Sequence, residues 1–377
     1  AAPEAASRMF GALPAAAIIR PVDHSLRREH LLADLPELQI DAILITRLPN
    51  VRYLSGFTGS NAQLLITETE ALFLTDPRYE EQARREVPDL RRETYYPEFV
   101  ARLGEICLEL GAPRVGFEAA GLTYKTYQKL AEAGAVEVVP MGEVVEPLRW
   151  VKDAEELSLI EQAQELTDHA YDLATAKLAE GMTEKEVALE LEQAMRQAGA
   201  EGSAFDSIVA FGENAAEPHH RPNDRALSPG DVVKFDFGCV VEGYHSDMTR
   251  TVAFGEPPGE LVEIHELVLR AQRAGVEALR PGVTGGTADK AAREVIREAG
   301  YGDRFGHSLG HGVGLEIHEG PGLRRESTDV IPEGAVVTVE PGVYLPGRGG
   351  VRIEDMVVVE TDGARPLPRS PRELVVL

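Results

Sequence analysis

Short apolar runs alternate with helical patterns in the first part of the chain, from about Ile40 to Met141. IDAILIT reads as a buried strand, QLLITETEALFLTD as a hairpin, and VGFE and VEVVPM as two further strands. Between them PRYEEQARREV, FVARLGEICLEL and LTYKTYQKLAEAG have the apolar spacing of amphipathic helices. Strands that alternate with helices predict an α/β domain.

The second part of the chain begins with a long amphipathic helix. Asp153 and Glu156 form a capping pattern at its start, and Thr183 with Glu186 repeats that pattern before a second helix. The order of two helices followed by strands then occurs again, and residues 180–199 and 281–300 share five identities at a fixed offset of 101. These features predict an internally duplicated α+β domain, with a site between its halves on a pseudo-twofold axis.

Two strand pairs of this domain place acidic residues where apolar residues are expected. A hairpin about Val241–Gly243 has facing residues whose numbers sum to about 483, so that Asp236 lies opposite Asp247. A second hairpin about Gly347, with a sum of about 694, sets Glu340 opposite Glu354. Because like charges in opposed positions repel, each pair requires a cation. One such pair can arise by chance, whereas one in each half of a duplicated domain favours a site.

A histidine-rich segment, HSLGHGVGLEIHEGP, lies between the two hairpins. A lone histidine is more often structural, but His307, His311 and His318 fall within twelve residues of a glycine-rich stretch. The spacing is not that of an HExxH zinc helix. Four carboxylates can be neutralised by two divalent ions, and oxygen ligands with an imidazole suit Mn²⁺, Co²⁺, Fe²⁺ or Zn²⁺. Two such ions can activate a water for hydrolysis.

At these residues the chain resembles the creatinase-like, or pita-bread, metallopeptidases, which include methionine aminopeptidase, aminopeptidase P and prolidase. The motifs that carry the resemblance are DFG with GYHSDMTRT, HSLGHGVGLEIHEGP, VEPGVY and VRIEDMV, in the family's order. The resemblance implies an α/β N-terminal domain over 9–147 and a pita-bread catalytic domain over 148–377. It also implies two metal ions, most often Mn²⁺, with Co²⁺ or Zn²⁺ as alternatives. The implied metal ligands are Asp236, Asp247, His311, Glu340 and Glu354.

The same resemblance assigns roles around the metals. His219 and His318 would polarise the scissile carbonyl, and Glu340 would also accept a proton from the nucleophilic water. His307 would line the pocket for the residue after the scissile bond, and Arg352 would sit beside the metals and the substrate. For Arg352, charge balance of the acidic cluster is the alternative interpretation.

The extra N-terminal domain favours the Xaa-Pro branch of the family over methionine aminopeptidase. Within this branch prolidase cleaves dipeptides and aminopeptidase P trims longer peptides, and the compact chain favours prolidase. A dipeptide site needs a cation for the free carboxylate beside proline. Arg47 and Arg52 are candidates if their loop reaches the catalytic mouth of its own or a neighbouring subunit, and Arg324 and Arg325 are alternatives. For any one of these arginines, a solvated surface position is the favoured interpretation.

Composition narrows the class of partner. The 377 residues carry 38 Lys+Arg and 63 Asp+Glu, a net charge of −25, which disfavours nucleic acid and anionic membranes. Two isolated cysteines and no apolar run near 18 residues are typical of a cytoplasmic protein without a membrane span. Residues 1–8 precede Met9 and are treated as a cloning remnant. The resemblance further implies a homodimer, while metal-free creatinase and non-catalytic scaffolds are the competing classes within the fold.

Overall fold

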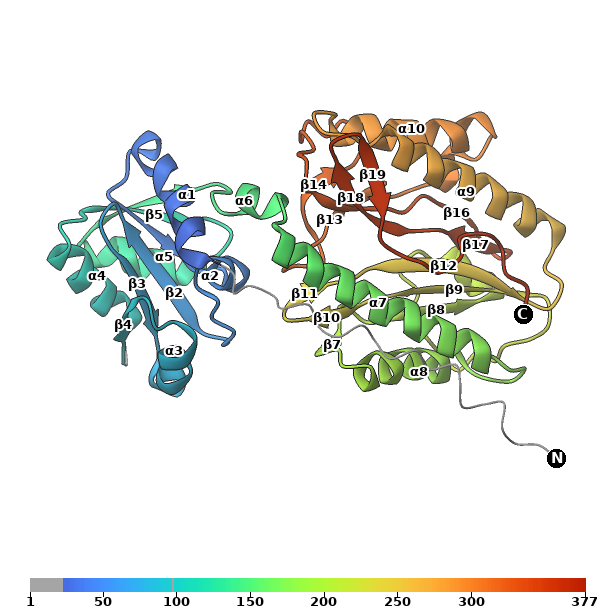
Figure 1. Ribbon diagram of the computed structural model, residues 1–377, viewed down its shortest axis with the longest axis horizontal. Coiled ribbons are helices and arrows are strands. Elements are labelled where there is room, and N and C mark those ends of the chain that lie inside the picture. The colour runs from blue at the N-terminus through green and yellow to red at the C-terminus, as the bar shows by residue number, and fades with distance from the viewer. Residues whose placement is uncertain (1–22, 97) are drawn as a thin grey trace.

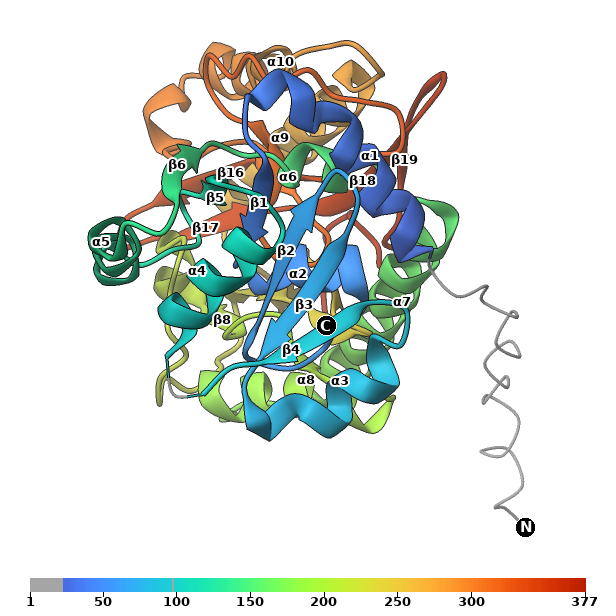
Figure 2. The ribbon, with the colours of Figure 1, turned by 90° about the vertical axis from the view of Figure 1, so that its left-hand side faces the viewer.

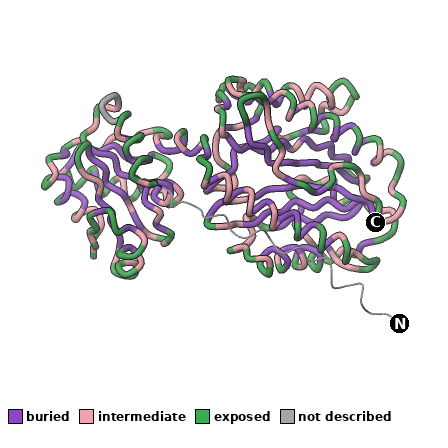
Figure 3. The backbone as a smooth tube through the Cα atoms, in the orientation of Figure 1, coloured by how far each residue is buried: buried purple, intermediate pink, exposed green. Residues whose placement is uncertain are grey.

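The chain forms two domains joined by a short helix, α6 (Glu146–Trp150) (Figure 1). This computed structural model describes residues 23–96 and 98–377, and for 34–37 the backbone only. Residues 1–8, the expected cloning remnant, lie outside the described residues. Figure 2 views the molecule from the side of the N-terminal domain, whose sheet lies in front of the catalytic domain. Buried backbone follows the strands of both domains (Figure 3).

The N-terminal domain is built on one mixed six-stranded sheet in the order β4-β3-β2-β1-β5-β6. Neighbouring side chains of a strand point to opposite faces, so Ile43 packs in one apolar cluster and Leu44 in another. Both faces are therefore covered, as an α/β domain requires. The strands are β1 (Ala42–Ile45), β2 (Ala62–Thr67), β3 (Ala71–Thr75), β4 (Arg91–Thr94), β5 (Arg114–Glu118) and β6 (Glu137–Met141).

The helices of this domain include three that the sequence pattern predicts and two that it does not. The predicted helices are α3 (Glu80–Glu86), α4 (Phe99–Glu109) and α5 (Tyr124–Ala133). The additional helices are α1 (His24–Leu38), which begins where the Asp23 carboxylate accepts bonds from two backbone amides, and α2 (Leu48–Ser55), which begins with a proline in its first turn. A 3₁₀ turn, η1 (Pro77–Tyr79), precedes α3.

The catalytic domain contains four long helices that flank its strands (Figure 1). The two predicted capping boxes are confirmed, because Asp153 and Thr183 each exchange bonds with a glutamate three residues on. The helices are α7 (Ala154–Lys177), α8 (Glu184–Gln197), α9 (Gly259–Ala278) and α10 (Gly285–Glu298), with 3₁₀ turns η2 (Gly212–Ala216) and η3 (Gly302–Arg304). Along the described chain, no helix combines the length and the apolar character that crossing a membrane demands.

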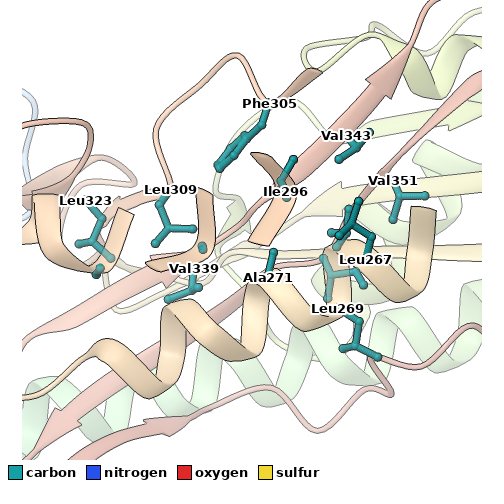
Figure 4. Packing of buried hydrophobic residues seen from close by; sticks show 14 of the residues in the cluster. Leu267, Leu269, Ala271, Ile296, Phe305, Leu309, Leu323, Val339, Val343 and Val351 are labelled. Atoms are coloured by element: carbon teal, nitrogen blue, oxygen red, sulfur yellow. The ribbon is translucent and has the colours of Figure 1, made fainter. Parts of the chain in front are cut away.

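The strands of the catalytic domain form several small antiparallel sheets. The first half contributes β7 (Gly202–Ser203), β8 (Ile208–Phe211), β9 (Asp231–Phe237), β10 (Cys239–Val241), β11 (Tyr244–His245) and β12 (Met248–Phe254). The second half contributes β13 (Gly310–Gly312), β14 (Glu319–Leu323), β15 (Val336–Val339), β16 (Gly342–Leu345), β17 (Gly349–Arg352), β18 (Asp355–Glu360) and β19 (Gly363–Pro366). Side chains of α9 and α10 pack with those of the second half in one apolar cluster (Figure 4).

The internal duplication extends to backbone detail. Helices α8 and α10 have the same length, and their ends are displaced by the same offset of 101 that relates the two sequence segments. Gly181 and Gly282, one before each helix, both have φ of 87°. This left-handed conformation favours glycine, so the matched glycines reflect a shared backbone requirement. The duplicated halves bring their two acidic hairpins together.

Candidate active site

A cavity of about 610 Å³ opens between the two halves of the catalytic domain. Its walls come from both acidic hairpins, from the histidine-rich segment and from the loop between β8 and β9. The sequence-predicted site residues that line it are Asp236, Asp247, His219, His307, His311, His318, Glu340, Arg352 and Glu354. Segments more than 100 residues apart therefore supply one site.

The first hairpin has a different register from the one that the sequence pattern suggests. The residue numbers of paired positions in strands β9 and β12 sum to 485, so Asp236 faces Thr249 rather than Asp247. The prediction of directly opposed aspartates was wrong because the turn consists of Glu242 and Gly243, both at positive φ. An error of two residues preserves the face of a strand, so both aspartates still line the cavity.

The second hairpin has the predicted register. The residue numbers of paired positions in strands β16 and β17 sum to 694. Strands β15 and β18 pair with the same sum on the other side of a short gap. Glu340 and Glu354 occupy this gap, between the two ladders. The interruption lets both carboxylates leave the strand surface and enter the cavity.

Three side chains from different elements converge as a potential metal site. Asp247, His311 and Glu354 each offer a ligand atom, and these atoms all lie within 4.8 Å of one another. His311 Nε2 is also 3.5 Å from Glu340 Oε1 and 3.7 Å from Asp247 Oδ2. Asp247 Oδ1 is buried without a hydrogen-bond partner in the described chain. An unpartnered buried carboxylate oxygen beside an imidazole is a donor set that fits a divalent cation.

Burial and mutual repulsion shift the pKa values of this cluster toward the uncharged forms. Burial raises the pKa of Glu340 to about 8. Burial, together with neighbouring carboxylates, raises the pKa of Asp247 and of Glu354 well above the ordinary range. Burial lowers the pKa of His311 to about 4. A bound cation would favour the ionised carboxylates, because it would supply the charge compensation that the cluster lacks.

The buried guanidinium of Arg352 reaches into the acidic cluster. Only 3% of the residue is exposed, and its guanidinium forms an ion pair with Asp236. The same group donates to Thr249 Oγ1 at 3.1 Å and to the Tyr344 hydroxyl at 2.9 Å. These bonds place Arg352 where it balances the charge of the acidic cluster, which is the alternative interpretation given to it from the sequence. Most of its donors are already used by other groups of the protein.

The remaining histidines differ in how freely they face the cavity. His219 and His318 are exposed at its wall, and the His318 ring stands edge-on to that of His311 with centroids 4.2 Å apart. His307 bonds through both ring nitrogens, to the Tyr344 hydroxyl and to the carbonyl of Ser308, each at 2.8 Å. Burial and the nearby Arg352 lower the pKa of His307 to about 3, so it acts as a neutral wall residue.

Arg47 does not line the cavity of its own chain. Its guanidinium forms ion pairs with Glu146 and with Glu316, the latter at 2.7 Å. Within this subunit both ends of the guanidinium are used at the domain interface, so a contact between Arg47 and substrate stays a prediction. Arg52 lies against the turn at Gly243. Arg324 and Arg325 line a second cavity of about 500 Å³, which shares His307 and Ser308 with the first.

Sequence reasoning missed several residues that organise the site. Tyr344 joins His307 to Arg352, and its ring occupies space above Gly342. The VEPGVY motif contained this signal, since Tyr344 lies two residues beyond the partner of Arg352 and so on the same face. Glu184, fully buried, bonds to His220 at 2.7 Å and to the amide of Asn223 at 3.0 Å, which fastens the loop that carries His219. No local sequence pattern predicts that contact.

Comparison with known proteins gives the class of the fold. Residues 158–361 match metallopeptidase family M24, and residues 27–151 match the creatinase/prolidase N-terminal domain. The chain therefore belongs to metallopeptidase family M24 and is a metallopeptidase with the pita-bread fold. Membership of this family implies divalent metal ions, in agreement with the donor set in the cavity.

Individual relatives extend over nearly the whole chain. An Xaa-Pro dipeptidase structure from Bacillus anthracis is 41% identical with a TM-score of 0.92, covering 94% of this chain and 100% of its own. The structure of X-Pro aminopeptidase from Thermotoga maritima is 40% identical with a TM-score of 0.85, covering 93% and 100%. Xaa-Pro dipeptidase of Pyrococcus furiosus is 39% identical over 93% of this chain and 99% of its own sequence.

Proposed function

We propose that this protein hydrolyses the peptide bond between an N-terminal residue and proline, with a preference for Xaa-Pro dipeptides. The observation that carries the proposal is the convergence of Asp247, His311 and Glu354, with ligand atoms within 4.8 Å, inside a cavity large enough for a short peptide. The relatives named for Xaa-Pro dipeptide and X-Pro peptide hydrolysis support the substrate class.

Asp236, Asp247, His311, Glu340 and Glu354 would hold two divalent ions, for which Mn²⁺ is our first choice and Co²⁺ or Zn²⁺ the alternatives. Such ions, when bound, lower the pKa of a water toward about 7 and polarise a carbonyl oxygen. Asp236, which is paired with Arg352, would contribute its carboxylate to the ions as well. The buried, acidic lining supplies the charge that the ions require.

The protein's own side chains then handle the proton and the carbonyl oxygen. Glu340, whose carboxylate lies 3.5 Å from His311 in the cavity, is suited to accept a proton from the attacking water and to pass it to the leaving proline nitrogen. His318 and His219, both at the cavity wall, would donate hydrogen bonds to the developing oxyanion. His307 and Tyr344 would form the wall against which the proline ring packs.

The preference for dipeptides is assigned to the cavity that adjoins His307. A dipeptide ends in a free carboxylate directly after the proline ring, and arginine is the side chain best suited to bind it. Arg324 and Arg325 line that second cavity, and neither side chain forms an ion pair within the described residues. We therefore place the carboxylate contact with these two arginines in preference to Arg47.

The decisive experiment compares cleavage of an Xaa-Pro dipeptide and the matching Xaa-Pro tripeptide by metal-loaded enzyme, for the wild type and for Arg324→Ala/Arg325→Ala. We expect faster cleavage of the dipeptide, and a rise of KM for the dipeptide alone in the variant. Arg304→Ala, which changes an exposed arginine of the third, smaller cavity nearby, is the matched control. Equal loss on both substrates would reject the carboxylate contact.

Aminopeptidase P activity on longer peptides is the second candidate, favoured by the Thermotoga maritima relative. Faster cleavage of the tripeptide than of the dipeptide would establish it. A protein that binds no Mn²⁺, Co²⁺ or Zn²⁺ and cleaves neither peptide would instead be a scaffold of the same fold. The homodimer implied by the family resemblance stays a prediction, to be measured by sedimentation equilibrium.

A further inference from the structure

The hairpin of β13 and β14 carries both His311 and His318. His311 lies within β13, and His318 immediately precedes β14, with the two rings 4.2 Å apart. The position of His318 therefore depends on how the connecting turn, residues 313–318, is held. His318 itself is exposed to the cavity, so its own side chain contributes little to fixing that turn.

The two glutamates that flank His318 in the sequence, Glu316 and Glu319, form ion pairs with lysine and arginine side chains. Glu316 accepts from Arg47 at 2.7 and 2.9 Å and forms an ion pair with Arg149 at 2.9 Å. Glu319 forms ion pairs with the other amino group of Arg149 and, at 2.8 Å, with Lys152. Arg149 thus spans His318, with one amino group on each flanking carboxylate.

None of these cations belongs to the duplicated helices and strands of the catalytic domain. Arg47 precedes α2 of the N-terminal domain, Arg149 lies on the linker helix α6, and Lys152 follows it. Arg149 is only 2% exposed, and it also donates to Asn50 Oδ1 of α2 at 2.7 Å. A Cβ at position 320 would lie 2.3 Å from Trp150 Nε1, so the linker helix also packs closely against the backbone beyond Glu319.

We infer that Arg149, with Arg47, is a positioning residue for His318, through which the N-terminal domain contributes to catalysis. A guanidinium that bridges two fixed carboxylates restrains the backbone between them in a way that a single surface ion pair does not. The inference rests on the proposed function, since it gives His318 the oxyanion contact. It adds that the linker and the N-terminal domain set the geometry of that contact.

The test is a double-mutant cycle with Arg149→Met and His318→Ala, measured on an Xaa-Pro dipeptide with Mn²⁺. We expect Arg149→Met to lower kcat by about 10- to 100-fold, as a displaced catalytic group would, with KM and bound metal nearly unchanged. In the His318→Ala background the same substitution should change kcat by less than about twofold, because the group it positions is gone. Arg149→Lys should recover part of the loss.

Arg27→Met is the matched control. Arg27 is a similarly buried arginine that also joins the domains, through ion pairs with Asp153 at 2.7 Å and Glu156 at 3.1 Å, but it contacts neither glutamate beside His318. We expect its kcat to stay within about threefold of the wild type and its loss to be unaltered by His318→Ala. Equal kcat losses for Arg27→Met and Arg149→Met would overturn the inference, because general domain docking would then explain both.

The inference would also be overturned if the kcat losses of Arg149→Met and His318→Ala simply multiplied in the double variant. If Arg149→Met does not fold, Arg47→Met takes its place in the same cycle. Of the two glutamates that flank His318 it releases only Glu316, together with its ion pair to Glu146, and it is expected to lower kcat in the same coupled manner. Wild-type protein without Xaa-Pro activity would contradict both the proposed function and this inference. An active wild type with uncoupled losses would contradict only the positioning role.

Discussion

The acids that the two duplicated hairpins bring to the cavity fall into two groups, which differ in what neutralises them. In the first group, Asp236 of the first hairpin forms an ion pair with Arg352, a residue that belongs to the second hairpin. In the second group, Asp247 of the first hairpin and Glu354 of the second hairpin form no ion pair with a lysine or arginine of the described chain, and Asp247 Oδ1 has no partner there. Glu354 accepts from Thr249 of the first hairpin at 2.7 Å.

This difference shows where the protein depends on an external cation. Arg352 compensates one carboxylate internally, so the Asp236 side of the cluster is stable on its own. The side of Asp247, His311 and Glu354 concentrates buried carboxylates whose pKa values are raised well above the ordinary range. Each hairpin also supplies the bond that holds an acid of the other, so neither half forms the site alone.

The largest expected effect comes from the uncompensated side. Asp247→Asn removes a carboxylate charge at the group of candidate ligands, and we expect bound metal to be lost together with about 10³-fold or more of kcat/KM, since even residues that only support metal ligands are worth 10–100-fold. Metal analysis and dipeptide hydrolysis measure both quantities. Asp206→Asn, at another aspartate of the cavity wall, is the control. Full activity with intact metal content in Asp247→Asn would contradict the ligand set.

The compensated side should respond mainly in stability. Arg352→Met leaves Asp236 buried without its cation, and breaking a buried ion pair in this way costs about 3–5 kcal/mol. We expect the free energy of unfolding, measured with urea, to fall by about this amount in metal-free protein. Added Mn²⁺ should recover part of it by supplying the missing charge. A variant as stable as the wild type without metal would show that Arg352 does not balance the cluster.

The pH dependence of stability distinguishes a metal-free from a metal-loaded cluster. Glu340 has a pKa of about 8 when folded, through burial, and an ordinary value when unfolded. The folded state therefore holds more protons than the unfolded state between about pH 4 and 8. The contribution of Glu340 to the free energy of unfolding falls as the pH rises through this range. We expect the Tm of metal-free protein to fall relative to that of Mn²⁺-loaded protein from pH 5 to 8. A constant Tm difference would contradict the raised pKa.

The smallest effect concerns the bond that crosses between the hairpins. Thr249→Val removes the hydroxyl that donates to Glu354 and accepts from Arg352, and we expect a loss of about 1–2 kcal/mol of unfolding free energy and a several-fold fall in kcat. Thr251→Val, on the same strand, removes a hydroxyl that donates to the backbone carbonyl of Arg352 and accepts from its backbone amide, and this substitution should leave kcat almost unchanged. Equal kcat losses in both variants would assign the effect to strand packing.

Local patterns predicted much of the fold because they depend on neighbours in the chain. The capping boxes at Asp153 and Thr183, the alternation of strands and helices, and the opposed Glu340 and Glu354 all follow from short-range spacing. The register of the first hairpin was wrong by two residues, since the sequence alone did not show that Glu242 adopts a positive φ. Helices α1 and α2 were missed because their apolar faces are short and their stability comes from packing.

The sequence by itself determined which side chains could serve chemistry here: acids at alternating positions in two hairpins, and histidines in a glycine-rich segment between them. Only the tertiary structure decided their partners. It paired Asp236 with Arg352, 116 residues away, and it joined Arg47 to Glu316, 269 residues away, at the domain interface. Strand period and turn chemistry depend on a few neighbouring residues. The partner of a buried charge depends on how the whole chain packs, because few cations can reach each buried site.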